Sequence, residues 1–243
     1  GKPIEQGFAM LPDSLIRNMG GFTQTALLKA SDVALLSMKE MPDEAESNTW
    51  HKACVALSGG VGGFFGIAGV SVELPISTTI MLRSIIDIAR SRGESINEID
   101  TKMACLEVFA LGGPGHLDDA SESGYYVVRS LMAKSVTEAT EYITQKKLVE
   151  DSTPVLIKFI ARVAERFGIQ VSEKVAAQTV PIIGAASGAI INTLFIDHFQ
   201  KIATGHFAVR RLERKYGREK IKSLYFELNK KPRCLAGKLG YAV

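Results

Sequence analysis

The sequence predicts an all-α protein that forms a single helical domain over residues 1–243. Helix-start and helix-stop signals recur along almost the whole chain, whereas alternating strand patterns joined by turn dipeptides are scarce. Hydrophobic residues make up 46% of the 243 residues and charged residues 23%, which suits a well-buried globular protein and excludes wholesale disorder. One domain with one core is the simplest organisation for this length.

The first half of the chain is expected to hold four helices after an N-terminal extension at 1–22. The best-marked start is "SINE" at 95–98, which fits a capping box, since its Ser and Glu side chains can satisfy free backbone N–H groups. The helix that it opens should run to about Leu111, where "GGPG" stops it. The predicted helices are 23–41, 47–68, 76–92 and 95–111.

The second half is expected to be helical as well. "STP" at 152–154 supplies a cap and a proline at the first helical position, and apolar residues follow at near-helical spacing up to Phe167, before Gly168. The last predicted helix begins at residue 206, and together with the tail that follows it forms a basic C-terminal segment at 206–243. The predicted helices are 118–147, 154–167, 173–180, 183–204 and 206–229.

Two glycine-rich apolar stretches, "SGGVGGFFGIAGVSVELP" at 58–75 and "VPIIGAASGAIINTLFI" at 180–196, form the expected central helix pair. Glycines four residues apart flatten one stripe of a helix and let another backbone approach closely, so these positions are candidate ligand contacts as well. A phosphate-binding loop is excluded because no lysine follows the glycines. A helical hairpin that can also enter a bilayer stays open, because residues 53–72 carry no charge. The glycines are Gly62, Gly66, Gly184 and Gly188.

These two stretches suggest a weak internal duplication with an offset of 114 residues. Each leads to a Thr that is followed nine residues later by Ile-Ala. The alternative is two buried helices of similar composition. In a duplication Arg83 and Asp197 occupy equivalent places, and we expect them to pair across the core.

Four ionisable side chains in apolar company are the candidate catalytic residues: Glu107, Asp197, His198 and His206. Glu107 has apolar neighbours three and four residues away on both sides, so its carboxyl must be paired, hydrogen-bonded or protonated. His198 and His206 lie two turns apart if the helix passes Gly205. Arg83 is the candidate ligand for an anionic group, although Asp87, one turn on, is a natural ion-pair partner. The alternative is that all of these residues are structural.

No strong catalytic, metal or cofactor motif is present, and we predict neither a metal nor a cofactor. The sequence lacks HExxH and GxSxG, and its three cysteines are far apart. His116 lies near Asp118 and Asp119, but either aspartate is better explained as a helix N-cap. The cysteine content and the absence of a visible secretory signal favour a cytoplasmic protein.

Positive charge is concentrated near the C-terminus. Between Val209 and Lys238 eleven Lys and Arg stand against three Glu, so this stretch carries +8 and the rest of the chain −5. The stretch can be a solvated, salt-bridged helix or can bind an anionic lipid surface. Nucleic acid is not an expected partner, because interleaved aromatic residues are missing. The candidate membrane-facing residues are Arg210, Arg211, Arg214 and Lys215.

Two blocks of the sequence resemble the EcsC family. They are "LPISTTIMLRSIIDIARSRGESINEIDTKMACLEVFALGG" at 74–113 and "VPIIGAASGAIINTLFIDHFQKIATGHFAVRRLERKYG" at 180–217. The resemblance implies a bacterial, largely helical protein. The family's founding member is encoded beside an ABC transporter linked to protein export, so a membrane protein complex is an implied partner. Arg83, Asp197, His198 and His206 belong to the shared pattern, but the family supplies no role for them.

Two function classes follow from these observations. The first is a membrane-peripheral protein that associates with lipid or a hydrophobic ligand at the inner face of the plasma membrane. The second is a soluble hydrolase that uses the four candidate catalytic residues, with Arg83 binding an anionic substrate group. Burial of these five residues around one cavity would favour the hydrolase, whereas scattered ion pairs would favour the membrane protein.

Overall fold

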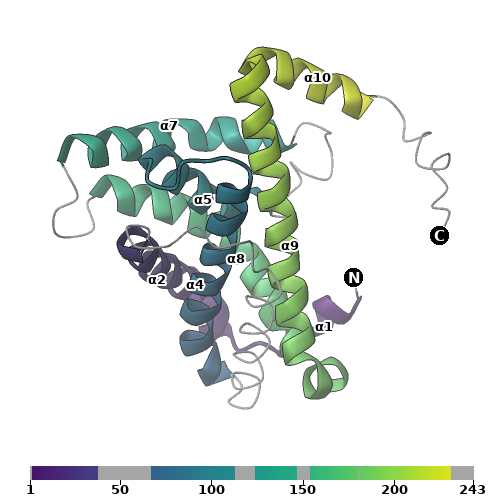
Figure 1. Ribbon diagram of the computed structural model, residues 1–243. Coiled ribbons are helices and arrows are strands. Elements are labelled where there is room, and N and C mark those ends of the chain that lie inside the picture. The colour runs from purple at the N-terminus through teal and green to yellow at the C-terminus, as the bar shows by residue number, and fades with distance from the viewer. Residues whose placement is uncertain (1, 38–66, 113–123, 147–153, 180, 231–243) are drawn as a thin grey trace.

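The computed structural model describes residues 2–37, 67–112, 124–146, 154–179 and 181–230, and in these ranges it is all-α (Figure 1). The expected fold class is therefore confirmed. No strand occurs in the described ranges. The helices are α1 (Lys2–Met10), α2 (Asp13–Ser37), α4 (Ile67–Ser91), α5 (Ile99–Leu111), α7 (Gly124–Lys146), α8 (Pro154–Thr179), α9 (Pro181–Tyr216) and α10 (Arg218–Lys230).

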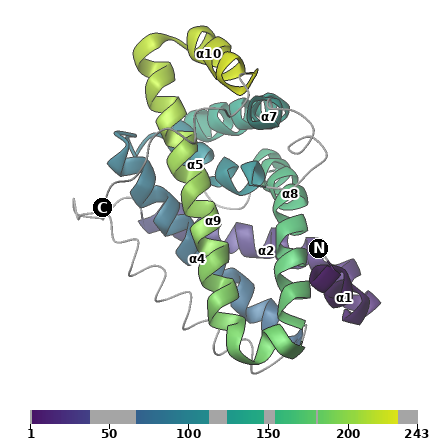
Figure 2. The ribbon, with the colours of Figure 1, turned by 90° about the vertical axis from the view of Figure 1, so that its right-hand side faces the viewer.

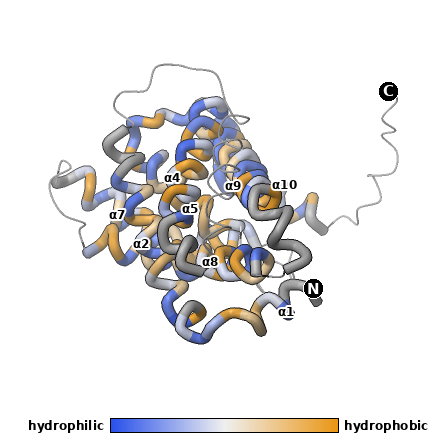
Figure 3. Tube along the Cα trace, turned by 90° about the horizontal axis from the view of Figure 1, so that it is seen from below, coloured by the Kyte–Doolittle hydropathy of each residue, from blue (hydrophilic) through white to orange (hydrophobic). Residues whose placement is uncertain are grey.

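Helix α5 forms the centre of the core. Every residue from Thr101 to Ala110 is buried, as expected for a helix that is apolar on nearly all sides. Helices α4, α7, α8 and α9 pack around it. The ring of Phe109 contacts those of Phe167 on α8 and Phe199 on α9, with centroids 4.8 and 5.3 Å apart. Figure 3 shows hydrophilic and hydrophobic residues mixed along α7 and α9, as expected where only one face is buried.

Helix α9 runs past the core and ends in a turn to α10 (Figures 1 and 2). It continues through Gly205, so the expected separate helix at 206–229 is wrong. The break lies instead at Gly217, whose φ of 89° is a left-handed conformation that favours glycine. The Gly217 N–H donates to the carbonyl of Glu213 at 2.9 Å, which closes the last turn of α9.

Residues 2–10 and 13–37, which include most of the expected N-terminal extension at 1–22, are helical. Helix α1 packs on α8, and α2 packs on α4 and α8. Gly7 lies so close to α8 that a Cβ added there would be 2.1 Å from the carbonyl oxygen of Ala176. A glycine is therefore required at this crossing for steric reasons.

Several expected helix ends are wrong, among them the expected start of α4 at 76, since α4 already begins at Ile67, and the two that follow. The "SINE" segment forms a turn, in which the Glu98 N–H donates to the Ser95 carbonyl at 3.0 Å, and α5 begins only at Ile99 without a side-chain cap. Helix α8 does not end at Gly168 but continues to Thr179. The buried residues Val171 and Val175 prolong its apolar stripe, so tertiary packing outweighs the low helix propensity of one glycine.

The glycine-rich helix pair lies largely outside the described part of the chain. Gly62 and Gly66 are not described, and Gly184 and Gly188 lie in the first turns of α9, whose surroundings there are not described either. The close crossing of the two stretches stays a prediction. Over the described residues, no helix is both long and apolar enough to cross a membrane.

Candidate functional site

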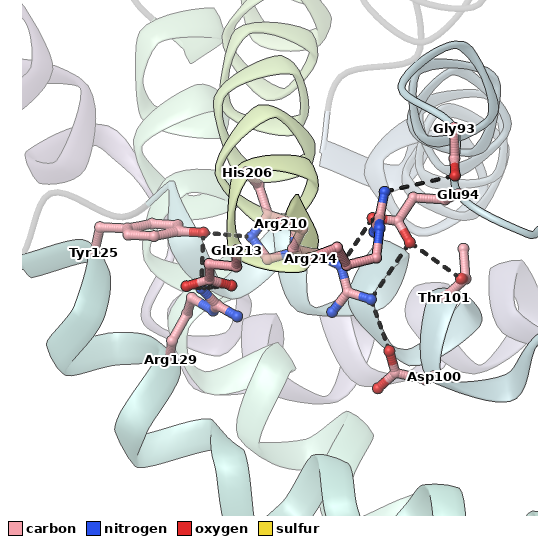
Figure 4. Close-up of polar contacts among 10 residues, drawn as sticks. All are labelled: Gly93, Glu94, Asp100, Thr101, Tyr125, Arg129, His206, Arg210, Glu213 and Arg214. Atoms are coloured by element: carbon pink, nitrogen blue, oxygen red, sulfur yellow. Dashed lines mark hydrogen bonds and ion pairs between the residues drawn. The ribbon is translucent and has the colours of Figure 1, made fainter. Parts of the chain in front are cut away.

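Two groups of buried and half-buried ionisable side chains lie where the C-terminal half of α9 passes between α7 and the turn that precedes α5 (Figure 4). One group, the tyrosine cluster, links α9 to α7 on one side. The other group, the Glu94 cluster, links α9 to that turn on the other side. The tyrosine cluster consists of Tyr125, Tyr126, Arg129, His206 and Glu213, and the Glu94 cluster of Glu94, Asp100, Thr101, Arg210 and Arg214.

Arg129 is the centre of the tyrosine cluster. Its guanidinium donates to both carboxylate oxygens of Glu213, at 2.9 and 3.1 Å, and to the Tyr125 hydroxyl at 3.3 Å. The Tyr126 hydroxyl donates to the same Glu213 carboxylate at 3.1 Å. Both side chains of the Arg129–Glu213 pair are about nine-tenths buried, so this is a buried ion pair with its hydrogen bonds satisfied.

His206 lies next to the Tyr125 hydroxyl and is 1% exposed. Its Nδ1 is 3.0 Å from the Tyr125 hydroxyl. The direction of this hydrogen bond depends on the His206 tautomer, and the other ring nitrogen, Nε2, is buried with no hydrogen-bond partner among the described residues. Burial, and then the charges of Arg129 and Arg210, lower the His206 pKa well below its usual value, so the ring is neutral.

In the Glu94 cluster two arginines of α9 share one buried carboxylate. Arg210 donates to Glu94 at 3.1 Å and to Asp100 at 2.7 Å, and Arg214 also donates to Glu94. Thr101 completes the hydrogen bonding of Glu94 at 3.5 Å. Burial opposes ionisation of Glu94, but the two arginines outweigh it and lower the Glu94 pKa.

Glu107 lies on α5 near both clusters and is 5% exposed, which confirms the predicted burial. No residue in the described ranges forms a hydrogen bond or an ion pair with its carboxyl group. Burial raises the Glu107 pKa to about 7, although the charges of Arg129 and Arg210 partly oppose this. The charge of Glu107 therefore changes close to neutral pH.

The structure brings Glu107 and His206 into one region but leaves Asp197 and His198 elsewhere. Asp197 pairs with the exposed Lys201 at 2.7 Å, and the exposed His198 has its Nε2 2.9 Å from the Gly112 carbonyl. His198 precedes His206 by eight residues of one helix, a rise of about 12 Å. The four candidate catalytic residues do not form one constellation.

The expected ion pair between Arg83 and Asp197 is wrong. Arg83 is exposed on α4, whereas Asp197 pairs with Lys201 within α9. Asp87, the other expected partner of Arg83, is 3.6 Å from Arg90. The offset of 114 residues that Arg83 and Asp197 share does not bring their side chains together, since α4 and α9 each turn a different face to the core.

The candidate membrane-facing residues divide into two kinds. Arg210, only 16% exposed, is held by Glu94 and Asp100, so its expected place on a solvated face is wrong. Arg214 is nearly half exposed and also pairs with Glu94. Arg211 and Lys215 are exposed. Successive side chains of a helix point about 100° apart. Arg210 and Arg214 therefore face their carboxylate partners, whereas Arg211 and Lys215 face solvent.

Sequence reasoning missed the partners of these residues: Tyr125, Arg129 and Glu213 on one side, and Glu94 on the other. One signal was present. His206, Arg210 and Arg214 recur every four residues, with Glu213 three residues after Arg210, and so follow one side of α9. Their partners are 81 to 120 residues away along the chain, and no local pattern indicates such pairing.

The arrangement suits structural cross-linking better than nucleophilic catalysis. Tyr125 is the hydroxyl that hydrogen-bonds to His206, and burial raises the Tyr125 pKa, which disfavours a reactive phenolate. Within the described ranges, no three His, Cys, Asp or Glu side chains are placed to hold a metal ion. The clusters instead tie α9 to α7 and to the turn before α5.

The model of the EcsC protein family matches residues 13–212 of this chain, which is more than four-fifths of its length. The chain belongs to the EcsC family. The EcsC match includes Glu94, Glu107, Arg129, His206 and Arg210 but ends one residue before Glu213. It therefore covers the helical core and not the turn into α10. No curated protein and no solved structure matches the chain.

Proposed function

We propose that this EcsC family member attaches peripherally to anionic membrane surfaces through its C-terminal hook, which we define as residues 211–230. The hook comprises the last turns of α9, Gly217 and α10. The observation that carries the proposal is a set of exposed large apolar side chains among exposed cations. The apolar residues are Leu212, Tyr216, Leu224 and Leu228, which are 43–69% exposed.

The charge of the hook complements an anionic surface. Two charged residues of the hook, Glu213 and Arg214, take part in the two clusters. The remaining charged residues of the hook are six Lys or Arg and two Glu. Arg211, Lys215, Arg218 and Lys220 are exposed. The ammonium groups of Lys215 and Lys220 lie 5.1 and 6.0 Å from the centre of the Tyr216 ring, so cations surround an aromatic anchor.

The free energies of the charge and apolar contacts are large enough for membrane attachment. A basic side chain near an anionic bilayer contributes about 1 kcal/mol, and full burial of a leucine side chain contributes about 1.5–3 kcal/mol. Two partly inserted leucines and three or four cations are therefore enough for reversible attachment. A helix with a polar, charged face and a few exposed apolar residues lies in the interface and does not span the bilayer. The cytoplasmic leaflet, which is rich in anionic lipid, is the surface that we propose.

The hydrolase alternative has less support. It requires Glu107, His206, Asp197, His198 and Arg83 around one cavity. Asp197, His198 and Arg83 lie at exposed or half-exposed positions, away from the buried Glu107 and His206. Scattered ion pairs of this kind favour the membrane-peripheral function over the hydrolase.

The test is flotation with phosphatidylglycerol-rich vesicles at low and high salt, beside neutral phosphatidylcholine vesicles. The hook variant replaces Arg211, Lys215 and Lys220 with Gln. We expect it to lose most of its binding, and the parent to bind less as salt rises, because surface charges are screened over about 10 Å at 0.1 M. Arg210 and Arg214 are left intact because they hold Glu94.

A matched control replaces three exposed lysines outside the hook, Lys29, Lys134 and Lys158, with Gln. It removes the same net charge from the surfaces of α2, α7 and α8. If the control loses as much binding as the hook variant, net charge and not the hook is responsible. Absence of parent flotation at low salt would overturn the proposal outright.

A further inference from the structure

We infer that α10 separates from α7 when the C-terminal hook binds a membrane, so that the whole apolar stripe of α10 enters the bilayer interface. The inference deepens the function proposed above and rests on it, although the docking of α10 can be tested without lipid. Two observations carry it. Helix α10 follows a single left-handed glycine, Gly217, and aromatic rings hold it against α7.

Three ring contacts join α10 to α7. The Tyr225 ring lies 5.1 Å from that of Tyr126 and 5.7 Å from that of Tyr125. The Phe226 ring lies 5.8 Å from that of Tyr126. Over the described residues, no side chain of α10 forms a hydrogen bond or an ion pair with α7. Aromatic pairs are individually weak contacts, so this docking can be broken without disrupting the core.

The docked position divides the apolar stripe of α10 between the protein and solvent. Four apolar residues follow the i, i+3, i+4, i+7 spacing of one helix face: Ile221, Leu224, Tyr225 and Leu228. Ile221 is buried and Tyr225 is half-buried, whereas the other two are 43% and 69% exposed. A helix that lies in a membrane interface buries such a stripe as one surface. Only an undocked α10 can do so with all four residues.

The charges of α10 suit the undocked arrangement. By helical periodicity, Lys220 and Lys222 lie on opposite flanks of the stripe, about 100° from its centre. Long lysine side chains at such positions can reach anionic head groups while the stripe is inserted. Glu219 lies on the side opposite the stripe, and Glu227 lies two turns from Lys220 on its flank.

The hinge lies just beyond the point at which α9 is anchored. The Arg129–Glu213 ion pair and the Tyr126 hydroxyl hold the last turns of α9 against α7. Gly217 follows four residues after Glu213, is exposed, and has no atom within 4 Å of where a Cβ would lie. Helix α10 can therefore swing about Gly217 while α9 stays in place. With 13 residues, α10 is marginal as an isolated helix in water, so it needs either α7 or an interface.

Docking on α7 and insertion into a membrane therefore compete for the same helix face. Removal of the α7 ring that contacts both Tyr225 and Phe226 should strengthen membrane binding, because α10 no longer has to be released first. A hook that binds as a rigid docked unit would show no such gain. The sign of the effect separates the two arrangements.

The experiment compares Tyr126→Ala with Tyr126→Phe, which loses the hydroxyl bond to Glu213 but keeps the ring. Without lipid, hydrogen–deuterium exchange should show the protection of amides 221–228 falling on the order of tenfold in the Ala variant, since two ring contacts are lost. The Phe variant should stay near the parent. In flotation at low salt, Tyr126→Ala should need about tenfold less phosphatidylglycerol-rich lipid for half-maximal binding than the parent.

A measurement on the parent covers the case in which Tyr126→Ala does not fold. Tyr126 is 2% exposed in the docked structure. Its oxidation in hydroxyl-radical footprinting should therefore increase when phosphatidylglycerol-rich vesicles are added, relative to the half-buried Tyr142 on the same helix. Constant or lower oxidation of Tyr126 on bound vesicles would overturn the inference.

Two results with the variants would overturn it as well. The first is parent-like protection of α10 in Tyr126→Ala, which would mean that the rings do not hold the helix. The second is flotation of Tyr126→Ala no stronger than that of the parent although the protection of α10 has fallen. If the parent itself does not float, the membrane proposal fails, and the exchange measurement without lipid still decides whether the rings of α7 hold α10.

Discussion

Arg210 and Arg211 are adjacent on α9, but replacing each with Gln should affect a different property. Loss of Arg210 should lower the stability of the protein, whereas loss of Arg211 should weaken membrane binding at unchanged stability. Arg210→Gln removes hydrogen bonds of 3.1 Å to Glu94 and 2.7 Å to Asp100. Glu94 is 4% exposed and would keep Arg214 and Thr101, whereas Asp100 is 57% exposed and can be hydrated. Arg211 is exposed, and no clash or lost ion pair follows from its replacement by Gln.

The magnitude for Arg210→Gln follows from this geometry. Removing one partner of a buried ion pair costs about 3–5 kcal/mol, but the remaining arginine and the hydrated Asp100 place this case at about 2–3 kcal/mol. At about 2–4 °C per kcal/mol for a chain of this size, the melting temperature should fall by roughly 4–12 °C. The Arg211→Gln variant should unfold at the parent's urea midpoint.

Urea unfolding followed by circular dichroism measures the stability of both variants, and vesicle flotation measures their binding. Arg211→Gln should weaken flotation at unchanged stability, whereas Arg210→Gln should lower the stability. Equal urea midpoints for the two variants would refute the assignment of Arg210 to the buried network. Equal flotation of the parent and the Arg211→Gln variant would count against the hook as the membrane-binding surface.

Three further outcomes are expected. Lys174→Met should destabilise the protein by about 3–5 kcal/mol, because it strands Glu73, which is 2.6 Å away and buried; adding Glu73→Leu should recover most of this in a double-mutant cycle of urea unfolding. Because the Glu107 pKa rises to about 7 on folding, the free energy of unfolding should fall by about 3 kcal/mol between pH 4.5 and 7, and chemical unfolding of Glu107→Gln should not show that fall. Gly7→Ala should destabilise α1 by about 1–3 kcal/mol, since its Cβ would meet the Ala176 carbonyl; a thermal melt that overlays the parent would contradict this.

Local sequence signals were reliable where a helix is both well punctuated and apolar. The start of α8 at Pro154 and the end of α5 at Leu111 were predicted, because a proline at the first helical position and a glycine after the last one act locally. The ends at Gly168 and Gly205 were wrong. In both places the helix gains enough from continued packing to absorb about 1 kcal/mol per glycine, and that gain depends on residues from other helices.

The sequence by itself determined the helical class, the burial of Glu107 and the concentration of positive charge near the C-terminus. Each of these follows from composition or from spacing within one helix. The tertiary structure decided which charges are available. Arg210 and Arg211 are adjacent along the chain, and the approach of Glu94, 116 residues away from Arg210, makes one a buried partner while the other stays an exposed cation. Long-range pairing is set by how helices pack, since the energy of a charge depends on what surrounds it and not on its neighbours in sequence.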